Sequence, residues 1–279
     1  MNWILKSAIQ DVFSFIPFGE QLNYFGQRYI FKMVPMDNDS FQKKVNSGHQ
    51  HFESAVKYKS SDITKLVFYE FGAGLDLVVP LSLYSLGVRR QIVTDIRKLA
   101  REFLILDAMR RLYIDHRQLS DCGIRYIAPF DARSTGLESY SIDVITSTDV
   151  LEHIEPLTLR DILKECFRIL RPGGIASFEI DYGDHYSYID NRISMYNFLR
   201  YSDKAWSLFN PSLHYQNRLR HSDYIKLFLA VGFHVIEDHP WIASSADFEY
   251  MLRLRIAKRF KAYSNDDLRI LGSRVVLLK

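Results

Sequence analysis

From residue 65 onward, short apolar runs alternate with longer segments of helical periodicity. Runs bounded by turn or polar residues predict strands at 65–71, 91–95, 124–128, 142–147, 175–181, 233–238 and 274–278. Apolar residues at helical spacing predict helices between them, at 77–86, 98–112, 158–170 and 222–230. Such alternation implies an α/β fold: a parallel sheet with helices on both faces and ligand sites at the carboxyl ends of its strands.

Local signals predict where these helices begin and end. Thr158 with Asp161 resembles a capping box, and Ser222 has the side chain of a helix N-cap. Pro172 and Gly173 predict the end of the 158–170 helix, because proline cannot continue a helix and glycine accepts a left-handed turn.

Two stretches stand outside the alternation. The chain has 279 residues, enough for one large α/β domain with added helices. We expect residues 1–60 to be an N-terminal helical segment packing on the core, and 61–279 to be the main domain. The aromatic and polar stretch 182–221 follows the strand at 175–181, where an insertion lies over the ligand crevice and can act as a substrate lid.

The composition limits the partners and the compartment. A net charge of +3 and a pI near 8.7 are too mild to indicate nucleic-acid binding. Cys122 and Cys166 lie too far apart to suggest a disulfide framework or a metal site, so we expect neither and place the protein in the reducing cytoplasm. Residues 1–18 are too interrupted by polar side chains for a membrane span, and surface contact through 12–33 is not expected.

A glycine turn follows the first predicted strand, in the run Glu-Phe-Gly-Ala-Gly at 70–74. Glycines allow a sharp turn and a close approach to a nucleotide, although a turn without any ligand would look the same. The next strand ends in Asp95, where a carboxylate can accept hydrogen bonds from ribose hydroxyls. A dinucleotide-binding dehydrogenase would share this feature, but its fingerprint wants glycine where this chain has Leu77.

Three further features follow in order along the chain. Asp131 comes just after the third predicted strand, Asp-Val-Leu-Glu-His-Ile occupies 149–154, and Leu-Arg-Pro-Gly-Gly occupies 170–174. Together with the glycine turn and Asp95, this set closely resembles the class I S-adenosylmethionine-dependent methyltransferases of the small-molecule type. The resemblance implies a methyltransferase (EC 2.1.1.-) with S-adenosylmethionine as cofactor. It also implies a Rossmann-like, seven-stranded, mostly parallel sheet whose last strand, at 274–278, is antiparallel.

The resemblance carries a set of cofactor contacts onto this chain. One departure is Asp76, where many relatives have a third glycine, so that the helix packing or cofactor orientation there stays open. The implied contacts are Glu70, Gly72, Ala73 and Gly74 beside the methionine and ribose, Asp95 at the ribose, Ile96 and Asp131 with Ala132 around the adenine, and Thr148 with Asp149 beneath the sulfonium.

Methyl transfer to a hydroxyl usually needs a general base, whereas an amine needs alignment and loss of its proton. His185 directly follows the fifth predicted strand, where the acceptor should lie, and is the preferred base. His153 is the second candidate, although it can equally pack at a helix start.

The acceptor is expected to be a small molecule or glycan. Arginine forks in the lid suit carboxylate or phosphate, so anionic acceptors are included, and an exposed basic face is the alternative. Oxygen is the expected methylation site and nitrogen its nearest alternative; a non-catalytic protein that kept the nucleotide fold is a third hypothesis. The candidate substrate-binding residues are Glu152, Asp184, Tyr186, His214, Asn217 and Arg218.

Overall fold

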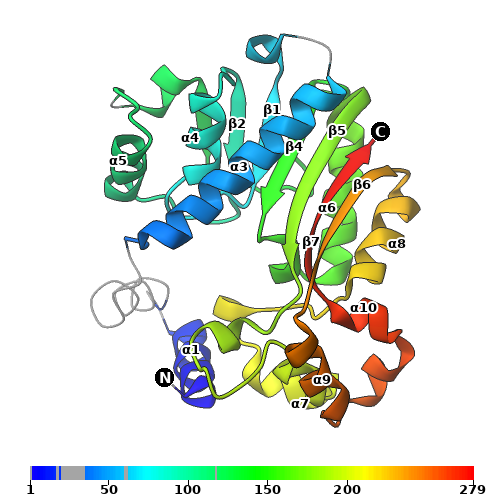
Figure 1. The fold of residues 1–279 in the computed structure, drawn as a ribbon. Helices are drawn as coiled ribbons and strands as arrows, with labels where there is room; N and C mark the ends of the chain where they lie inside the picture. Colours follow the sequence, from blue (N-terminus) through cyan, green and yellow to red (C-terminus); the bar gives the residue numbers. More distant parts are fainter. Residues whose placement is uncertain (1, 17–18, 20–34, 60–61, 117) are drawn as a thin grey trace.

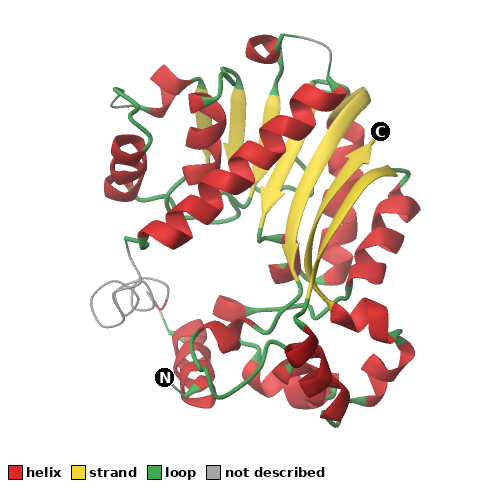
Figure 2. Cartoon of the chain, in the orientation of Figure 1, coloured by secondary structure: helices red, strands yellow, loops and turns green. Residues whose placement is uncertain are grey.

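The computed structural model describes the whole chain except residues 1, 17–18, 20–34, 60–61 and 117, and its centre is a seven-stranded sheet (Figures 1 and 2). The strand order is β3-β2-β1-β4-β5-β7-β6. β1 to β5 are parallel, and β7 is antiparallel to both β5 and β6. This confirms the predicted fold class. The strands are β1 Phe68–Phe71, β2 Gln91–Thr94, β3 Ile124–Ile127, β4 Ile142–Thr148, β5 Leu170–Asp181, β6 His234–Ile242 and β7 Ile270–Leu278.

Helices cover both faces of the sheet. On one face α3 (Asn38–Tyr58) crosses in front of β4 and β5 and packs on α4 (Val78–Ser85), which contacts α5 (Glu102–Arg111) (Figure 1). On the other face α6 (Pro156–Ile169) packs on β5 and on α8 (His221–Val231). Buried apolar side chains of the strands and helices fill both interfaces. The apolar runs of the sequence are thereby buried on two sides, as a parallel sheet requires.

A second hydrophobic cluster lies beyond the carboxyl ends of the strands. It joins α1 (Trp3–Phe15) to the 182–221 insertion and to residues after β6, and its members include Trp3, Tyr186 and Trp206. Figure 1 shows this part, with α7 (Asp203–Trp206), α9 (Ser245–Arg253) and α10 (Asn265–Arg269), below the sheet. Hence α1 packs on the insertion and α3 on the sheet. No helix in the described part of the chain is both long and apolar enough to cross a bilayer.

The helix ends depart from the predicted caps. The N-cap of α6 is Glu155, whose carboxylate accepts a hydrogen bond from the Thr158 backbone at 3.2 Å, so the predicted capping box at Thr158 is wrong. The predicted cap of α8 is also wrong, because the hydroxyl of Ser222 donates to Asp267 at 2.7 Å instead of capping the helix. Glu155 stands three positions before the predicted cap of α6, whereas Asp267 reaches Ser222 from 45 positions further along the chain.

The end of α6 falls where proline and glycine predicted it, but the following residues already pair with β4. β5 therefore begins at Leu170, opposite Ile142, five residues earlier than predicted. β6 and β7 likewise extend beyond their predicted ranges because they pair with each other along most of their length.

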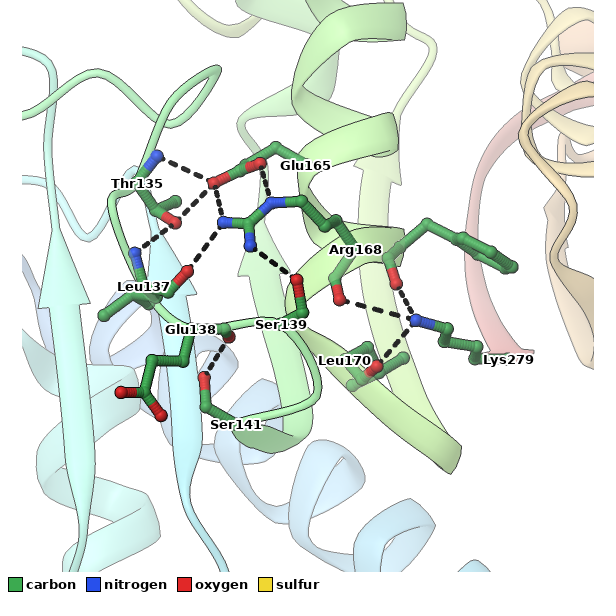
Figure 3. A network of polar contacts seen from close by, with 10 residues as sticks. Thr135, Leu137, Glu138, Ser139, Ser141, Glu165, Arg168, Leu170 and Lys279 are labelled. Carbon is green, nitrogen blue, oxygen red and sulfur yellow. Dashed lines mark hydrogen bonds and ion pairs between the residues drawn. The ribbon is translucent and has the colours of Figure 1, made fainter.

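A polar network fixes the loop after β3 to α6 (Figure 3). The carboxylate of Glu165 accepts hydrogen bonds from the Thr135 backbone at 2.8 Å and from the Arg168 guanidinium at 2.7 Å. Arg168 also donates to the Leu137 carbonyl at 2.7 Å, and Lys279 donates to the Leu170 carbonyl at 2.8 Å. The loop that leads away from the end of β3 is thereby held against α6, and Lys279 binds where α6 ends and β5 begins. We call these contacts the Glu165 network.

Candidate active site

A cavity of about 720 Å³ opens at the carboxyl ends of the strands. Its walls come from the loops after β1, β2, β3 and β4, from the start of α6, and from residues 212–215 of the insertion. This is the edge at which a doubly wound sheet binds its ligands, and the volume lies in the range of small-molecule sites.

The glycine turn after β1 forms one wall. Gly72 has φ +77°, and a Cβ at this position would lie 2.5 Å from a methyl of Val150. The loop after the neighbouring strand β4 therefore approaches too closely for any residue but glycine. Gly74 has φ +74° and lines the cavity, and a Cβ there would meet no atom within 4 Å. The turn is therefore tight on one side and open toward a ligand on the other.

Asp95 and Ile96 form the wall at the end of β2. The Asp95 carboxylate accepts hydrogen bonds from the backbone of Gly74 at 3.1 Å and of Arg97 at 3.2 Å, and its burial raises its pKa. Ile96 is 57% exposed although it is apolar, and it lines the cavity. A carboxylate beside an apolar surface suits a ribose next to an adenine ring.

Asp131 and Ala132 line the cavity from the loop after β3. The Asp131 carboxylate is held by the Arg133 guanidinium, with Nε at 3.0 Å and Nη2 at 2.6 Å, and these hydrogen bonds lower its pKa. Asp131 can therefore contact an adenine amino group only while Arg133 shares its carboxylate. The sequence alone did not point to Arg133.

Three predicted cofactor residues lie behind the cavity wall. Glu70 is buried and accepts a hydrogen bond from the Thr146 hydroxyl at 3.0 Å, and burial raises its pKa to about 8. Ala73 packs against the core around α4, and the Thr148 hydroxyl lies 3.0 Å from Nε2 of His51. The structure places these side chains where they support the loops rather than line the cavity.

His51 is a site-supporting residue that no sequence signal indicated. It belongs to α3 and is fully buried, with Nδ1 2.7 Å from the Ser177 hydroxyl and Nε2 at Thr148. Burial, with the charge of Arg274, lowers its pKa to about 3. The neutral ring therefore ties α3 to β4 and β5 beneath the cavity.

Side chains after β4 and β5 meet in a group that we call the carboxylate–histidine cluster. Nε2 of His185 lies 3.3 Å from Oδ2 of Asp181 and 4.0 Å from Oε1 of Glu152, and the ring centroids of His153 and His185 are 4.8 Å apart. Asp149 lines the adjoining cavity wall, together with both histidines, and has a left-handed backbone with φ 52°. The cluster comprises Asp149, Glu152, His153, Asp181 and His185.

Burial and mutual charge shift the pKa values of the cluster. Burial, with the charge of Asp181, raises the pKa of Asp149 to about 6. Burial, with the charges of Asp149 and Asp181, raises the pKa of Glu152 well above its usual value. Burial also acts to raise the pKa of Asp181, but the hydrogen bonds and charge of His185 and the hydrogen bond from Tyr188 outweigh it and lower that pKa. Shifts of this kind gather at functional sites.

Polar partners are distributed unevenly in the cluster. His153 Nδ1 lies 2.7 Å from the Tyr215 carbonyl, which can only accept, so Nδ1 carries the proton and Nε2 keeps a lone pair. Glu152 is 3% exposed, and neither of its carboxylate oxygens has a hydrogen-bond partner of normal geometry among the described residues.

The predicted substrate residues divide into two groups. His214 lines the cavity, and burial lowers its pKa to about 2. The other lid residues have structural partners: Asn217 donates to the carbonyls of Leu151 and Ile154 at 2.9 Å, and Asp184 accepts from the Tyr186 backbone at 2.9 Å. These bonds fold the insertion and the turn after β4.

Tyr186 and Arg218 also face structural partners rather than the cavity. The Tyr186 hydroxyl donates to the Phe209 carbonyl at 2.8 Å. Arg218 is buried and donates to the Phe198 carbonyl at 2.9 Å and to Asp203 at 2.6 Å. The guanidinium predicted to bind an anionic acceptor is thus committed to the folded insertion.

Sequence reasoning did not list Asp181, Tyr188, Leu213 or Tyr215 as site residues. Asp181 ends β5 as Asp95 follows the end of β2, so its place at a strand end was an available signal. Leu213 and Tyr215 line the cavity only because of the path that the insertion takes, and no sequence pattern marks that path.

Residues 107–178 match the protein-family model of a methyltransferase domain, over roughly a quarter of the chain. No curated protein sequence matches the chain. The match contains Asp131 and the motifs at 149–154 and 170–174, whereas the glycine turn and Asp95 precede it. The recognised segment therefore includes Asp131 and the cluster residues Asp149, Glu152 and His153, whereas Asp181 and His185 follow it.

Solved structures resemble the chain at low identity. The [4+2]-cyclase SpnF shares 13% identity at a TM-score of 0.51, covering 83% of this chain and 81% of its own. An S-adenosylmethionine-dependent methyltransferase from Mesorhizobium loti shares 15% at 0.47, covering 82% and 98%. One from Archaeoglobus fulgidus shares 10% at 0.49, covering 92% and 99%.

The structural likeness shows the fold and, since one of these proteins is a cyclase, does not by itself show the reaction. The domain match supplies the enzyme class. The chain has the Rossmann-like methyltransferase fold, and part of it matches the methyltransferase-domain model; together these support an S-adenosylmethionine-dependent methyltransferase (EC 2.1.1.-) with S-adenosylmethionine as the expected cofactor.

Proposed function

We propose that the protein transfers a methyl group from S-adenosylmethionine to a hydroxyl oxygen of a small-molecule or glycan acceptor. The observation that carries this proposal is the contact between the cofactor-sized cavity and the carboxylate–histidine cluster. Asp149, His153 and His185 line the same cavity as the glycine turn and Asp95. A nucleotide cofactor and a proton-accepting group would therefore be neighbours.

The residues at the cavity fit the cofactor. Gly74 leaves open space beside the methionine and ribose portions, Asp95 offers a carboxylate to the ribose, and Ile96 offers an apolar surface to the adenine. Asp131 with Ala132 would meet the adenine edge. When bound, S-adenosylmethionine supplies an activated methyl group, so the protein's task is alignment and removal of the acceptor proton.

On the acceptor side, we propose that His185 is the general base. Its Nε2 lies 3.3 Å from the Asp181 carboxylate, which the Gly183 backbone holds at 2.7 Å and the Tyr188 hydroxyl also contacts. A fixed carboxylate orients an imidazole and stabilises the imidazolium that forms when the base takes a proton. His153, with the lone pair of Nε2 exposed to the cluster, is the second candidate.

The charges in the cluster favour neutral or cationic acceptor groups at this end of the cavity. Asp149, Glu152 and Asp181 gather there, while the Arg218 guanidinium is bound inside the insertion. Three carboxyl groups would also attract an ammonium group, and this arrangement supports N-methylation as the second candidate function. We propose the insertion at 182–221 as the lid that closes over the acceptor.

Calorimetry with S-adenosylmethionine and S-adenosylhomocysteine tests the cofactor. Asp95→Ala should weaken binding by about tenfold or more, the value of hydrogen bonds to a charged group. Asp161→Ala, an exposed position on α6, is the control and should bind like the wild type. A folded protein that binds neither molecule would overturn the proposal.

Methyl transfer is tested with labelled S-adenosylmethionine in an extract of small molecules and glycans. Labelled product identifies the acceptor, and its chemistry decides between oxygen and nitrogen. Cofactor binding without transfer to any acceptor would instead favour the non-catalytic alternative.

A further inference from the structure

We propose that Glu152, His153 and His185, with Asp181 as a fourth ligand, bind one divalent transition-metal ion of the zinc type beside the cofactor cavity. Ion binding stands independently of methyl transfer. The role assigned to the ion below rests on the proposed function.

The donor atoms of these side chains lie close enough together to share one ion. Glu152, His153 and His185 each offer a ligand atom, and these atoms all lie within 4.8 Å of one another. From Nε2 of His185 the distances are 4.0 Å to Oε1 of Glu152 and 3.3 Å to Oδ2 of Asp181. Bonds of about 2.0–2.1 Å in a tetrahedral zinc site separate ligand atoms by about 3.3 Å. Small side-chain rotations would therefore close the site.

The His153 ring is oriented as in a metal site. Its Nδ1–H donates to the backbone carbonyl of Tyr215 at 2.7 Å, which leaves the Nε2 lone pair for the cluster. Metal-binding histidines nearly always donate their other ring N–H to a carbonyl or carboxylate in this way. Asp181 is held similarly, because Gly183 donates to its Oδ1 at 2.7 Å while Oδ2 faces His185.

The side chain of Glu152 is a further candidate ligand. Both of its carboxylate oxygens are buried and lack a normal hydrogen-bond partner within the described chain. Its backbone is pinned, because the Glu152 carbonyl accepts from the Asn217 backbone at 2.8 Å and Asn217 also binds the Leu151 carbonyl. A buried polar group without a partner is unfavourable, and an ion would satisfy this one.

The donor set also selects the kind of ion. Mg²⁺ and Ca²⁺ prefer sites built from oxygen ligands alone. Two imidazoles with carboxylates suit Zn²⁺ and its neighbours Co²⁺ and Ni²⁺. The site is beside the cavity rather than remote from it, because His153 and His185 line the wall.

An ion at this position would act on the acceptor hydroxyl. A coordinated hydroxyl loses its proton to water more readily, because the cation stabilises the oxyanion. The oxyanion then forms a bond to the methyl carbon, the carbon–sulfur bond breaks, and its electron pair stays on sulfur, leaving S-adenosylhomocysteine. His185, as a ligand, would not serve as base in the ion-loaded enzyme, whereas in the ion-free enzyme its imidazole takes the proton.

Metal titration of the full-length, chelator-treated protein tests the site. Zn²⁺ is titrated by calorimetry and Co²⁺ by visible absorbance, because four-coordinate Co²⁺ gives intense bands. We expect one ion per chain. Glu152→Gln and His153→Ala should each weaken binding by about tenfold or more. The control His234→Ala removes an exposed histidine of β6 and should leave binding unchanged.

Two results would overturn the site: no stoichiometric binding by the wild type, or wild-type affinity for the ion in both Glu152→Gln and His153→Ala. Affinity for S-adenosylhomocysteine is measured on the same samples. Intact cofactor binding without ion binding defeats this inference alone, whereas ion binding without cofactor binding defeats the proposed function alone. If Glu152→Gln does not fold, His153→Ala decides, since it removes a ligand and leaves the buried carboxylate in place.

Discussion

Two glutamates that lie between β4 and β5 in the sequence have opposite surroundings. Glu165 belongs to the Glu165 network, where Thr135 and Arg168 satisfy its carboxylate, and the hydrogen bonds from Arg168 lower its pKa to about 2. Glu152 lies only 13 positions earlier, yet burial and neighbouring carboxylates raise its pKa well above the usual value. The first carboxylate is charged and paired, and the second is buried beside other acids.

The difference separates a polar cluster that supports the fold from one that awaits a ligand. In the Glu165 network the donors and acceptors satisfy one another, so the network needs nothing else. In the carboxylate–histidine cluster, Glu152 has no normal hydrogen-bond partner in the described structure, and the group lines a cavity through its histidines. Groups left unsatisfied at a cavity point to function.

The largest expected effect is on turnover. His185→Ala should reduce methyl transfer by about 10²- to 10⁴-fold, the usual contribution of a general base or ligand at the reacting oxygen. Affinity for S-adenosylhomocysteine should stay near the wild-type value. Initial rates with labelled cofactor and calorimetry on the same preparation measure the two quantities.

His116→Ala provides the control for this variant, because its ring bonds the Tyr84 hydroxyl outside the cavity lining. It should retain full turnover. Unchanged turnover in His185→Ala would mean that this ring only supports the fold, as the Glu165 network does.

The next effect is on stability. Glu165→Gln should lower the free energy of unfolding by about 2 kcal/mol, because the substitution removes the charge that pairs with Arg168 and places an amide against donors. Urea denaturation monitored by circular dichroism measures the change. Asp161→Asn, on an exposed part of the same helix, should change it by less than about 0.5 kcal/mol. A loss no larger than the control's would show that the network adds little.

The same contrast explains what the sequence could predict. The alternation of strands and helices, the glycine turn and Asp95 depend on local patterns. The sheet confirms the alternation, and the glycine turn and Asp95 line the cavity. Gly72 could be foreseen as a tight turn, but its contact with Val150 joins two loops that only the folded sheet brings together.

The rest of the site depends on how distant segments meet. His51 reaches Thr148 from an N-terminal helix, and Tyr215 orients His153 from the insertion. Arg218 looked like an anion-binding residue, but the insertion turns its guanidinium inward to Asp203. Residue type alone does not distinguish these roles, because each is set by tertiary contacts between segments far apart in the chain.

The pH dependence should run in opposite directions in the two clusters. Glu165 has a lowered pKa, so its contribution is present above the unfolded value near 4.5 and is lost as the pH falls toward about 2. Asp149 has a pKa raised to about 6, so its contribution is present below its unfolded value near 3.8 and is lost as the pH rises through 6.

Acidification should therefore bring both variants toward the stability of the wild type. Glu165→Gln loses its deficit in unfolding free energy, and Asp149→Asn loses its advantage. Between pH 7 and pH 4, Asp149→Asn should lose a small advantage in unfolding free energy over the wild type, because water at the exposed Asp149 screens its charge. Between pH 5 and pH 3, the deficit of Glu165→Gln should shrink. Urea denaturation at each pH gives both curves, and parallel behaviour of the two variants would refute the contrast.

The smallest expected effect is the sharpest test of Glu152. In ion-free protein, Glu152→Gln should change the free energy of unfolding by less than about 1 kcal/mol, because a neutral amide replaces a carboxyl whose raised pKa favours the neutral form. The identical substitution at Glu165 should cost about 2 kcal/mol. Added Zn²⁺ should stabilise the wild type by mass action and stabilise Glu152→Gln less. Equal losses at both positions would mean that Glu152, like Glu165, is paired within the fold and that its cluster needs no ligand.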